Sequence, residues 1–168
     1  MSVKHENELV SSKSQAKRLE EIGHKFVFLL QQPDITQRVH TSPNENEWSV
    51  MQTLGHLVEM MPFWTNHCYL LIAANEESFQ FGRELDAPER VDGIHRGNNL
   101  ELDEIVILLK QVIHETVQAI LSMSKEEREK KGLHIKYGQM TVAEVIEQLI
   151  VLHAEEHLNQ VSSTFQIK

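Results

Sequence analysis

Three histidines in this sequence have the residue type and spacing of metal ligands. His153 and His157 stand four residues apart in the segment "QLIVLHAEEHLNQV", and His56 stands in "EWSVMQTLGHLVEM". Residues at positions i and i+4 of an α-helix lie on the same side, one turn apart. Neutral imidazole is a common ligand of divalent transition metals. Two histidines on one helix and a third on a facing helix could therefore bind one ion and leave it open coordination positions.

A helical wheel places these histidines on apolar faces. At 100° per residue, His153 and His157 fall in the middle of the stripe that contains Ile146 and Leu149, and His56 lies at the centre of the apolar face of its own segment. An imidazole that is buried without a partner costs about 1–3 kcal/mol, and a shared ion would offset that cost. Spacing and facing alone leave metal ligation and ordinary core histidines equally open.

Four segments with a period near 3.6 could position these side chains. Ser49 and Thr141 are good N-caps, and Glu144 completes a capping box with Thr141. Trp48 precedes the cap Ser49 and could pack onto the first turn of that helix. Asn98 or Asn99 is the expected cap of the third helix. The expected helices run from 9 or 12 to 32, from 49 to about 78, from about 99 to at least 120, and from 141 to about 165.

The expected fold class is therefore all-α: a single domain over residues 1–168, built as a four-helix bundle with long interhelical connections. No strand pattern competes with the helices. Pro62 should kink the second helix without ending it, because an inward face that includes Phe63, His67 and Leu70 continues beyond it.

Composition restricts the class of partner. The 168 residues carry a formal net charge of −9, which opposes binding to the phosphate backbone of nucleic acid. The apolar runs are shorter than the roughly 20 residues of a membrane-spanning helix, and the first residues are too polar for a secretory signal. The single cysteine, Cys68, cannot form an intramolecular disulfide. We expect a cytoplasmic protein with neither a nucleic-acid nor a membrane partner.

Two motifs in this order resemble the DinB/YfiT-like superfamily over essentially the whole chain. "EWSVMQTLGHLVEM" is similar to the W-S-x(6)-H-L-x-E start of the second helix in that family, and "HAEEHLNQV" is similar to its closing H-x(3)-H-x-x-Q. The resemblance implies that His56, His153 and His157 are the three ligands of a divalent ion, usually nickel or zinc. It also implies an enzyme class, because family members include metal-dependent S-transferases that use thiols such as bacillithiol and a mycothiol-dependent maleylpyruvate isomerase.

The segment "HAEEH" also fits H-x-x-E-H, a protease signature in which the glutamate is the general base. Those proteases take a third ligand, a glutamate, from further along the chain. The sequence after His157, "LNQVSSTFQIK", contains no acidic residue. We therefore do not expect protease activity.

Other residues receive secondary roles. Glu156 and Glu59 border the histidine faces and are candidate catalytic bases, with surface ion pairs as the alternative. Gln160 is expected to hydrogen-bond a ligand imidazole or the bundle. His67 lies about 16 Å along the helix from His56, too far to share an ion. Cys68 has no lysine or arginine nearby in the sequence to lower its pKa, so we expect a structural role and not a nucleophilic one. The remaining histidines have surface or loop interpretations: His5, His24, His40, His95, His114 and His134.

Three neutral imidazoles leave an ion its full positive charge, so it can activate a bound water or a bound thiol. Hypothesis A is a thiol S-transferase that attacks an electrophilic small molecule. Hypothesis B is a metal-dependent hydrolase that uses the same ion. Hypothesis C is a non-enzymatic bundle, alone or as a homodimer, with a structural ion or none. The expected partner is a small-molecule substrate, with a low-molecular-weight thiol preferred.

Overall fold

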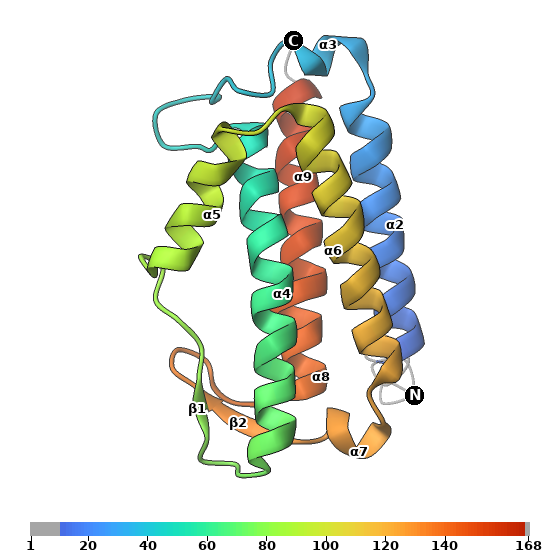
Figure 1. Cartoon of the computed structure of the whole chain (residues 1–168), viewed down its shortest axis with the longest axis vertical. Helices are drawn as coiled ribbons and strands as arrows, with labels where there is room; N and C mark the ends of the chain where they lie inside the picture. The colour runs from blue at the N-terminus through green and yellow to red at the C-terminus, as the bar shows by residue number, and fades with distance from the viewer. Residues whose placement is uncertain (1–10, 167–168) are drawn as a thin grey trace.

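The computed structural model describes residues 11–166, and four long helical segments pack lengthwise in it (Figure 1). The segments are α2 (Ser12–Leu30), α4 (Val50–Ala74), α6 (Leu102–Ser122) and a C-terminal run made of α8 (Val142–Val145), the π-helical η1 (Ile146–Val151) and α9 (Leu152–Gln166). In Figure 1, α2 and the C-terminal run point one way, and α4 and α6 point the other. The predicted all-α four-helix bundle is confirmed.

The helix starts follow from capping. Ser49 Oγ accepts the N–H of Gln52 at 3.2 Å, and the Gln52 side chain accepts the N–H of Ser49 at 2.9 Å. Thr141 and Glu144 form the same reciprocal pair at the start of α8. Both predicted caps are confirmed. The predicted cap of the third helix is wrong, because Glu101 and not Asn98 or Asn99 caps α6.

Pro62 lies inside α4, so the prediction that it does not end the helix is confirmed. The helix ends at Ala74, earlier than expected, because Asn75 adopts a left-handed conformation with φ 49° and its N–H bonds back to Leu71 O. Leu70, expected inside, is 42% exposed. The alternative start of the first helix at residue 9 lies outside the described residues.

A small sheet lies beside one end of the bundle, where no strand was expected. Its strands are β1 (Gln80–Phe81), β2 (Lys131–His134) and β3 (Gly138–Thr141). β1 pairs parallel with β2 through Gln80 opposite Leu133, and β2 pairs antiparallel with β3 through Lys131 opposite Thr141. The expectation of a purely helical chain is therefore wrong for these residues. Two further short helices are α3 (Pro33–Thr36) and α7 (Lys125–Arg128).

The connection between α4 and α6 contains a helix that the sequence did not indicate, α5 (Pro88–Asn98), which lies along α4 (Figure 1). Glycines face each other across this contact. A Cβ on Gly55 would lie 2.4 Å from Gly93 O, and a Cβ on Gly97 would lie 2.0 Å from Met51 O. Because these positions have no side chain, the backbones of α4 and α5 approach closely.

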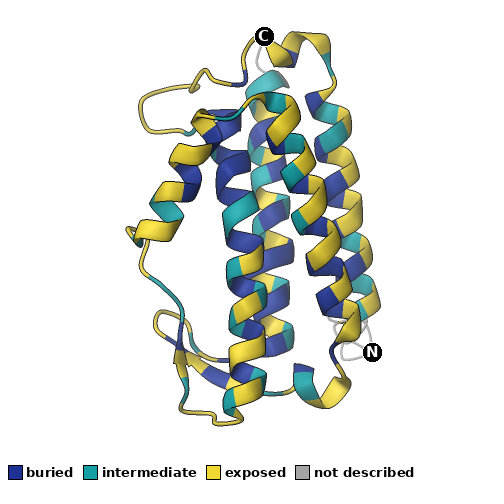
Figure 2. Ribbon diagram, in the orientation of Figure 1, coloured by how far each residue is buried: buried dark blue, intermediate teal, exposed yellow. Residues whose placement is uncertain are grey.

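Apolar side chains fill the space between the four long segments, and exposed residues cover their outer faces (Figure 2). Cys68 is fully buried in this core. α6 has the length and hydropathy of a membrane-spanning helix, but a core helix can show the same values. It packs against α2 and α4 and buries Ile105 and Leu109. The cytoplasmic location and the lack of a membrane partner stay predictions.

The close contact between α4 and α5 predicts that Gly97→Ala destabilises the protein. Alanine favours a helix by roughly 1 kcal/mol over glycine, but the clash with Met51 O must push α5 away from α4. We expect a net loss of about 1–2 kcal/mol in the free energy of unfolding, measured with urea. Asp92→Ala on the exposed side of α5 is the control. Unchanged stability of Gly97→Ala would contradict the close approach.

Candidate metal centre

The three predicted histidines come together between α4 and α9. Nε2 of His153 lies 3.1 Å from Nε2 of His56 and 3.0 Å from Nε2 of His157. The ligand atoms of all three residues lie within 4.8 Å of one another. The spacing of His153 and His157 places their rings one turn apart on the same side of α9, where they meet edge-on, and α4 supplies the third ring from the facing side. Sequence spacing and facing thus predicted the assembly of this cluster correctly.

Hydrogen bonding fixes the ring orientation of one histidine. The Nδ1–H of His157 donates to Oε1 of Gln160 over 3.0 Å, so Nε2 of His157 carries the lone pair. The expected bond from Gln160 to one of these imidazoles is therefore confirmed. Nδ1 of His56 is buried and has no hydrogen-bond partner among residues 11–166.

The cluster stays neutral at physiological pH. Burial, followed by the nearby charges of His157 and His153, lowers the pKa of His56 from 6.5 to about 2. Burial, followed by the charge of His157, lowers the pKa of His153 to about 4. Burial also lowers the pKa of His157, against the opposing effect of Gln160. His56 is only 3% exposed, whereas the other two are half-buried, so solvent reaches the cluster from the α9 side.

Aromatic and basic side chains surround the three-histidine cluster, and the sequence had not assigned them to it. The Trp48 ring stacks on His157 with centroids 6.0 Å apart and meets His56 edge-on at 5.3 Å. The guanidinium carbon of Arg90 lies 5.2 Å from the centre of the Trp48 ring. The charges of Arg90 and Arg83 both contribute to the lowered pKa of His153. Neither arginine stands in a motif, so only the fold reveals them.

The two candidate bases have different surroundings. Both Nη atoms of Arg83 contact the Glu59 carboxylate, with Nη2 2.7 Å from Oε2. Glu59 is thus held in an ion pair near the cluster. Glu156 is exposed on α9, and its negative charge raises the pKa of His157. A catalytic role for either glutamate stays a prediction.

Two other residues are structural. His134 was expected on the surface or in a loop, but both expectations are wrong: it lies in β2 and is 4% exposed, and its Nδ1 accepts hydrogen bonds from the N–H groups of Lys136 and Tyr137. Cys68 is fully buried, and burial raises the pKa of its thiol to about 12. A thiol with so high a pKa is a poor nucleophile, which agrees with the structural role predicted for Cys68.

His67 does not join the three-histidine cluster. Its Nδ1–H donates to Phe63 O over 2.9 Å, and its ring packs against Phe63 and Trp64. This arrangement matches the expectation of a core or second-pocket histidine, too far from His56 to share an ion.

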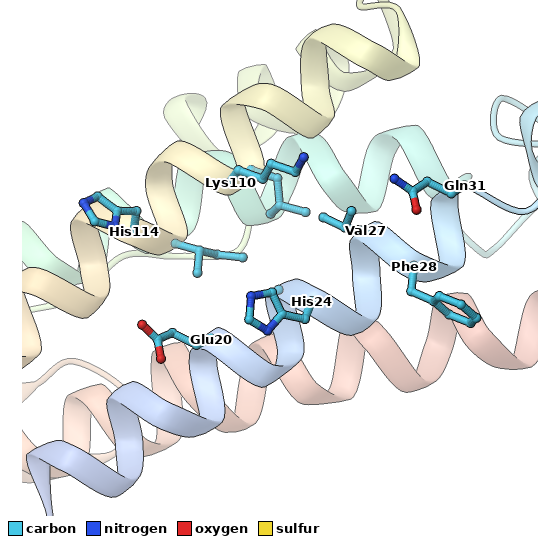
Figure 3. Close-up of a pocket in the computed structure, with 10 residues that line it drawn as sticks. Glu20, His24, Val27, Phe28, Gln31, Lys110 and His114 are labelled. Atoms are coloured by element: carbon cyan, nitrogen blue, oxygen red, sulfur yellow. The ribbon is translucent and has the colours of Figure 1, made fainter.

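A separate hollow of about 500 Å³ lies between α2 and α6 (Figure 3). Its polar lining includes Glu20 and His24 from α2 and Lys110 and His114 from α6. None of the three clustered histidines lines it. His24 and His114 are exposed, as their surface interpretation predicted. They are therefore suitable control positions for experiments on metal binding.

The cluster fits a divalent ion. Two nitrogens that bind one ion at 2.0–2.1 Å can lie at most about 4.2 Å apart, and both measured Nε2 separations are shorter than this. The donors are neutral imidazoles, which suit zinc and nickel.

The fold and this cluster define a helical bundle with a potential metal centre of three histidines. The chain belongs to the DinB superfamily, whose family model matches residues 18–161. A comparison with curated proteins gave no match.

Two solved structures share the fold. YfiT from Bacillus subtilis, described as a probable metal-dependent hydrolase with an unusual four-helix bundle topology, has a TM-score of 0.67 and 16% identity, over 91% of this chain and 85% of YfiT. The mycothiol-dependent maleylpyruvate isomerase has a TM-score of 0.70 and 13% identity, over 93% of this chain. The present chain corresponds to 61% of that isomerase.

The lowered pKa of His56 predicts that the metal-free protein loses stability in mild acid. Between its unfolded pKa of 6.5 and its folded pKa of about 2, the unfolded state binds a proton that the folded state does not. Stability therefore falls as the pH falls below 6.5. Urea unfolding in the presence of a chelator should show a loss of about 2 kcal/mol between pH 6.5 and about pH 5 from this group alone.

Two variants locate this effect. His56→Gln should show a shallower loss of stability with falling pH, because the group that resists protonation is gone. His24→Gln removes an exposed histidine and should retain the wild-type slope. Equal slopes for His56→Gln and the wild type would mean that burial of His56 is not the origin of the acid sensitivity.

Proposed function

We propose that this protein is a metal-dependent enzyme that binds a divalent ion, nickel or zinc, through His56, His153 and His157. The observation that carries the proposal is the convergence of three neutral Nε2 atoms at 3.0 and 3.1 Å. Membership of the DinB superfamily supports it, as does the description of a structural neighbour as metal-dependent.

The preferred activity is transfer of a small thiol to an electrophilic molecule. A bound divalent ion supplies Lewis acidity, which lowers the pKa of a thiol or water that coordinates it. The protein supplies the rest: Gln160 orients His157, and Trp48 covers the His56 and His157 rings. The partial exposure of His153 and His157 is compatible with approach of a small molecule from the α9 side. The thiol-dependent activity named for one structural neighbour supports this choice.

Hydrolysis by activated water is the second candidate, and the hydrolase description of YfiT favours it. The same three histidines would hold the ion. Glu156, exposed beside His157, is then the better placed general base, because Arg83 already occupies both oxygens of Glu59. A general base must be within hydrogen-bond reach of the proton that it accepts, and the oxygens of Glu59 are directed at Arg83 instead.

A purely structural ion is the third hypothesis. Structural sites are usually closed by four protein ligands, whereas the cluster formed within residues 11–166 contains three histidines within ligand distance. This count favours an open site. The homodimer stays a prediction that an enzyme and a structural protein could share.

Removal of any one ligand should abolish most metal binding. We expect His56→Ala, His153→Ala and His157→Ala each to lose most of the divalent metal found by elemental analysis after dialysis, while helical circular dichroism persists. His24→Ala and His114→Ala, at exposed positions near the other hollow, should keep it. Stoichiometric metal in His153→Ala would end the three-histidine model.

Thiol binding separates the two enzymatic hypotheses. In a cobalt-loaded protein, titration with 3-mercapto-1-propanol should produce a saturable near-ultraviolet band from sulfur-to-cobalt charge transfer, because a thiolate is a softer and more strongly bound ligand than water. The band should be absent in His157→Ala. A Cys68→Ser background excludes a signal from the buried protein thiol. A cobalt form that binds the thiol no better than chloride would favour hydrolysis.

A further inference from the structure

The packing of α5 on α4 brings one arginine toward the three-histidine cluster. Arg90 lies in the first turn of α5. Arg90, Gly93 and Gly97 are spaced i, i+3 and i+7, so they share one face of that helix. The glycine contacts with Gly55 and Met51 press this face against α4, which also carries His56. The side of α5 that carries Arg90 is thereby fixed against the helix of a proposed ligand.

The Arg90 side chain is held in place from two directions. Its Nη1 donates to Leu85 O over 2.6 Å, and its guanidinium lies over the Trp48 ring, with Cζ 5.2 Å from the ring centre. Trp48 in turn contacts His157 and His56. The positive charge of Arg90 contributes to the lowered pKa of each of the three histidines. Geometry and electrostatics thus agree that this guanidinium lies beside the cluster.

Arg83 provides an instructive contrast. Both of its Nη atoms contact Glu59, and its side chain is only 7% exposed. Its charge is therefore already compensated. Within residues 11–166, no carboxylate lies within 4.0 Å of Arg90, and its one hydrogen bond goes to a neutral carbonyl. A guanidinium has five N–H donors, arranged to bind a carboxylate in a bidentate manner.

We propose that Arg90 binds a carboxylate group of the substrate used at the three-histidine site, and that this contact makes the site selective for anionic substrates. The inference rests on the proposed function for the identity of the site. A guanidinium that is held in place, with no carboxylate within 4.0 Å among residues 11–166, forms a positive spot beside a cluster that would hold a dication, in a protein whose net charge is −9. Such a spot selects a small anion over a neutral molecule of the same shape.

Two thiols of equal length test the proposal in the cobalt-loaded Cys68→Ser protein: 3-mercaptopropionate and 3-mercapto-1-propanol. We expect the carboxylate thiol to bind at least about tenfold more tightly, as read from the sulfur-to-cobalt band. Arg90→Gln should reduce this preference to less than about threefold and leave binding of the alcohol unchanged. The preference of Arg90→Lys should lie between those of the wild type and Arg90→Gln, because lysine keeps the positive charge but lacks the planar guanidinium that binds a carboxylate in a bidentate manner.

Arg96→Gln is the matched control, because it removes an exposed arginine from the last turn of the same helix. It should keep the wild-type preference. The proposal is overturned if the wild type shows no preference for the carboxylate. It is equally overturned if Arg90→Gln retains the full preference, since the carboxylate would then be bound by the ion or by another group.

A metal-independent readout separates failure of this inference from failure of the proposed function. If neither thiol produces the band, S-transfer is contradicted, and the anion site is decided by Trp48 fluorescence in a Trp64→Phe background. Propionate should then cause a saturable change that 1-propanol does not cause and that Arg90→Gln abolishes. Identical responses to propionate and 1-propanol would contradict the anion site.

Discussion

The arrangement depends on one electrostatic constraint: in a largely buried place, Nε2 of His153 lies 3.1 Å from Nε2 of His56 and 3.0 Å from Nε2 of His157. Oε1 of Gln160 accepts a hydrogen bond from Nδ1–H of His157, so Nε2 of His157 carries a lone pair. Nε2 of His153 can donate a hydrogen bond to Nε2 of His157, or it can accept one from Nε2 of His56. In a neutral ring this one nitrogen cannot do both. Any placement of protons that keeps all three rings neutral leaves one of these two contacts without a hydrogen bond. A cation placed among the three lone pairs removes this conflict, which is why the geometry favours a metal over core histidines.

The bundle maintains this constraint because its rigid faces leave the rings little freedom. His56 projects from a helix whose neighbouring positions Met60 and Leu57 are fully buried, and α9 carries the other two rings one turn apart. Breaking the cluster by rotation would expose apolar surface, at roughly 25 cal/mol for each Å². The cost of three close imidazoles is thus offset by the packing of the whole core. The same burial keeps the rings unprotonated and available as ligands.

The sequence predicted the parts whose signal is local. Ser49 and Thr141 cap helices through neighbours three residues away, and His153 and His157 needed only helical spacing. The missed parts bury residues that carry no apolar signal. α5 packs through Gly93 and Gly97, and β2 buries Gly132 and His134, so neither has a readable hydrophobic period. Arg90 reaches the site from a connection distant in sequence from all three histidines, where no spacing rule applies, and Trp48 stands just before the helix that carries His56.

The chain direction explains why these unpredicted residues gather at the cluster. α4 and α6 run the same way (Figure 1), so residues 75–101 must travel back along the bundle before α6 begins. That return path carries Arg83 and Arg90 past the His56 side of α4. The helices thereby position the three histidines, while the connection determines the charge around them. α5 is held largely by the close approach of its glycines to α4, so its exposed side chains, such as His95 and Arg96, can change with little effect on the bundle. Under the proposal that Arg90 selects anionic substrates, this connection can vary that selection while the three-histidine cluster and the fold remain the same.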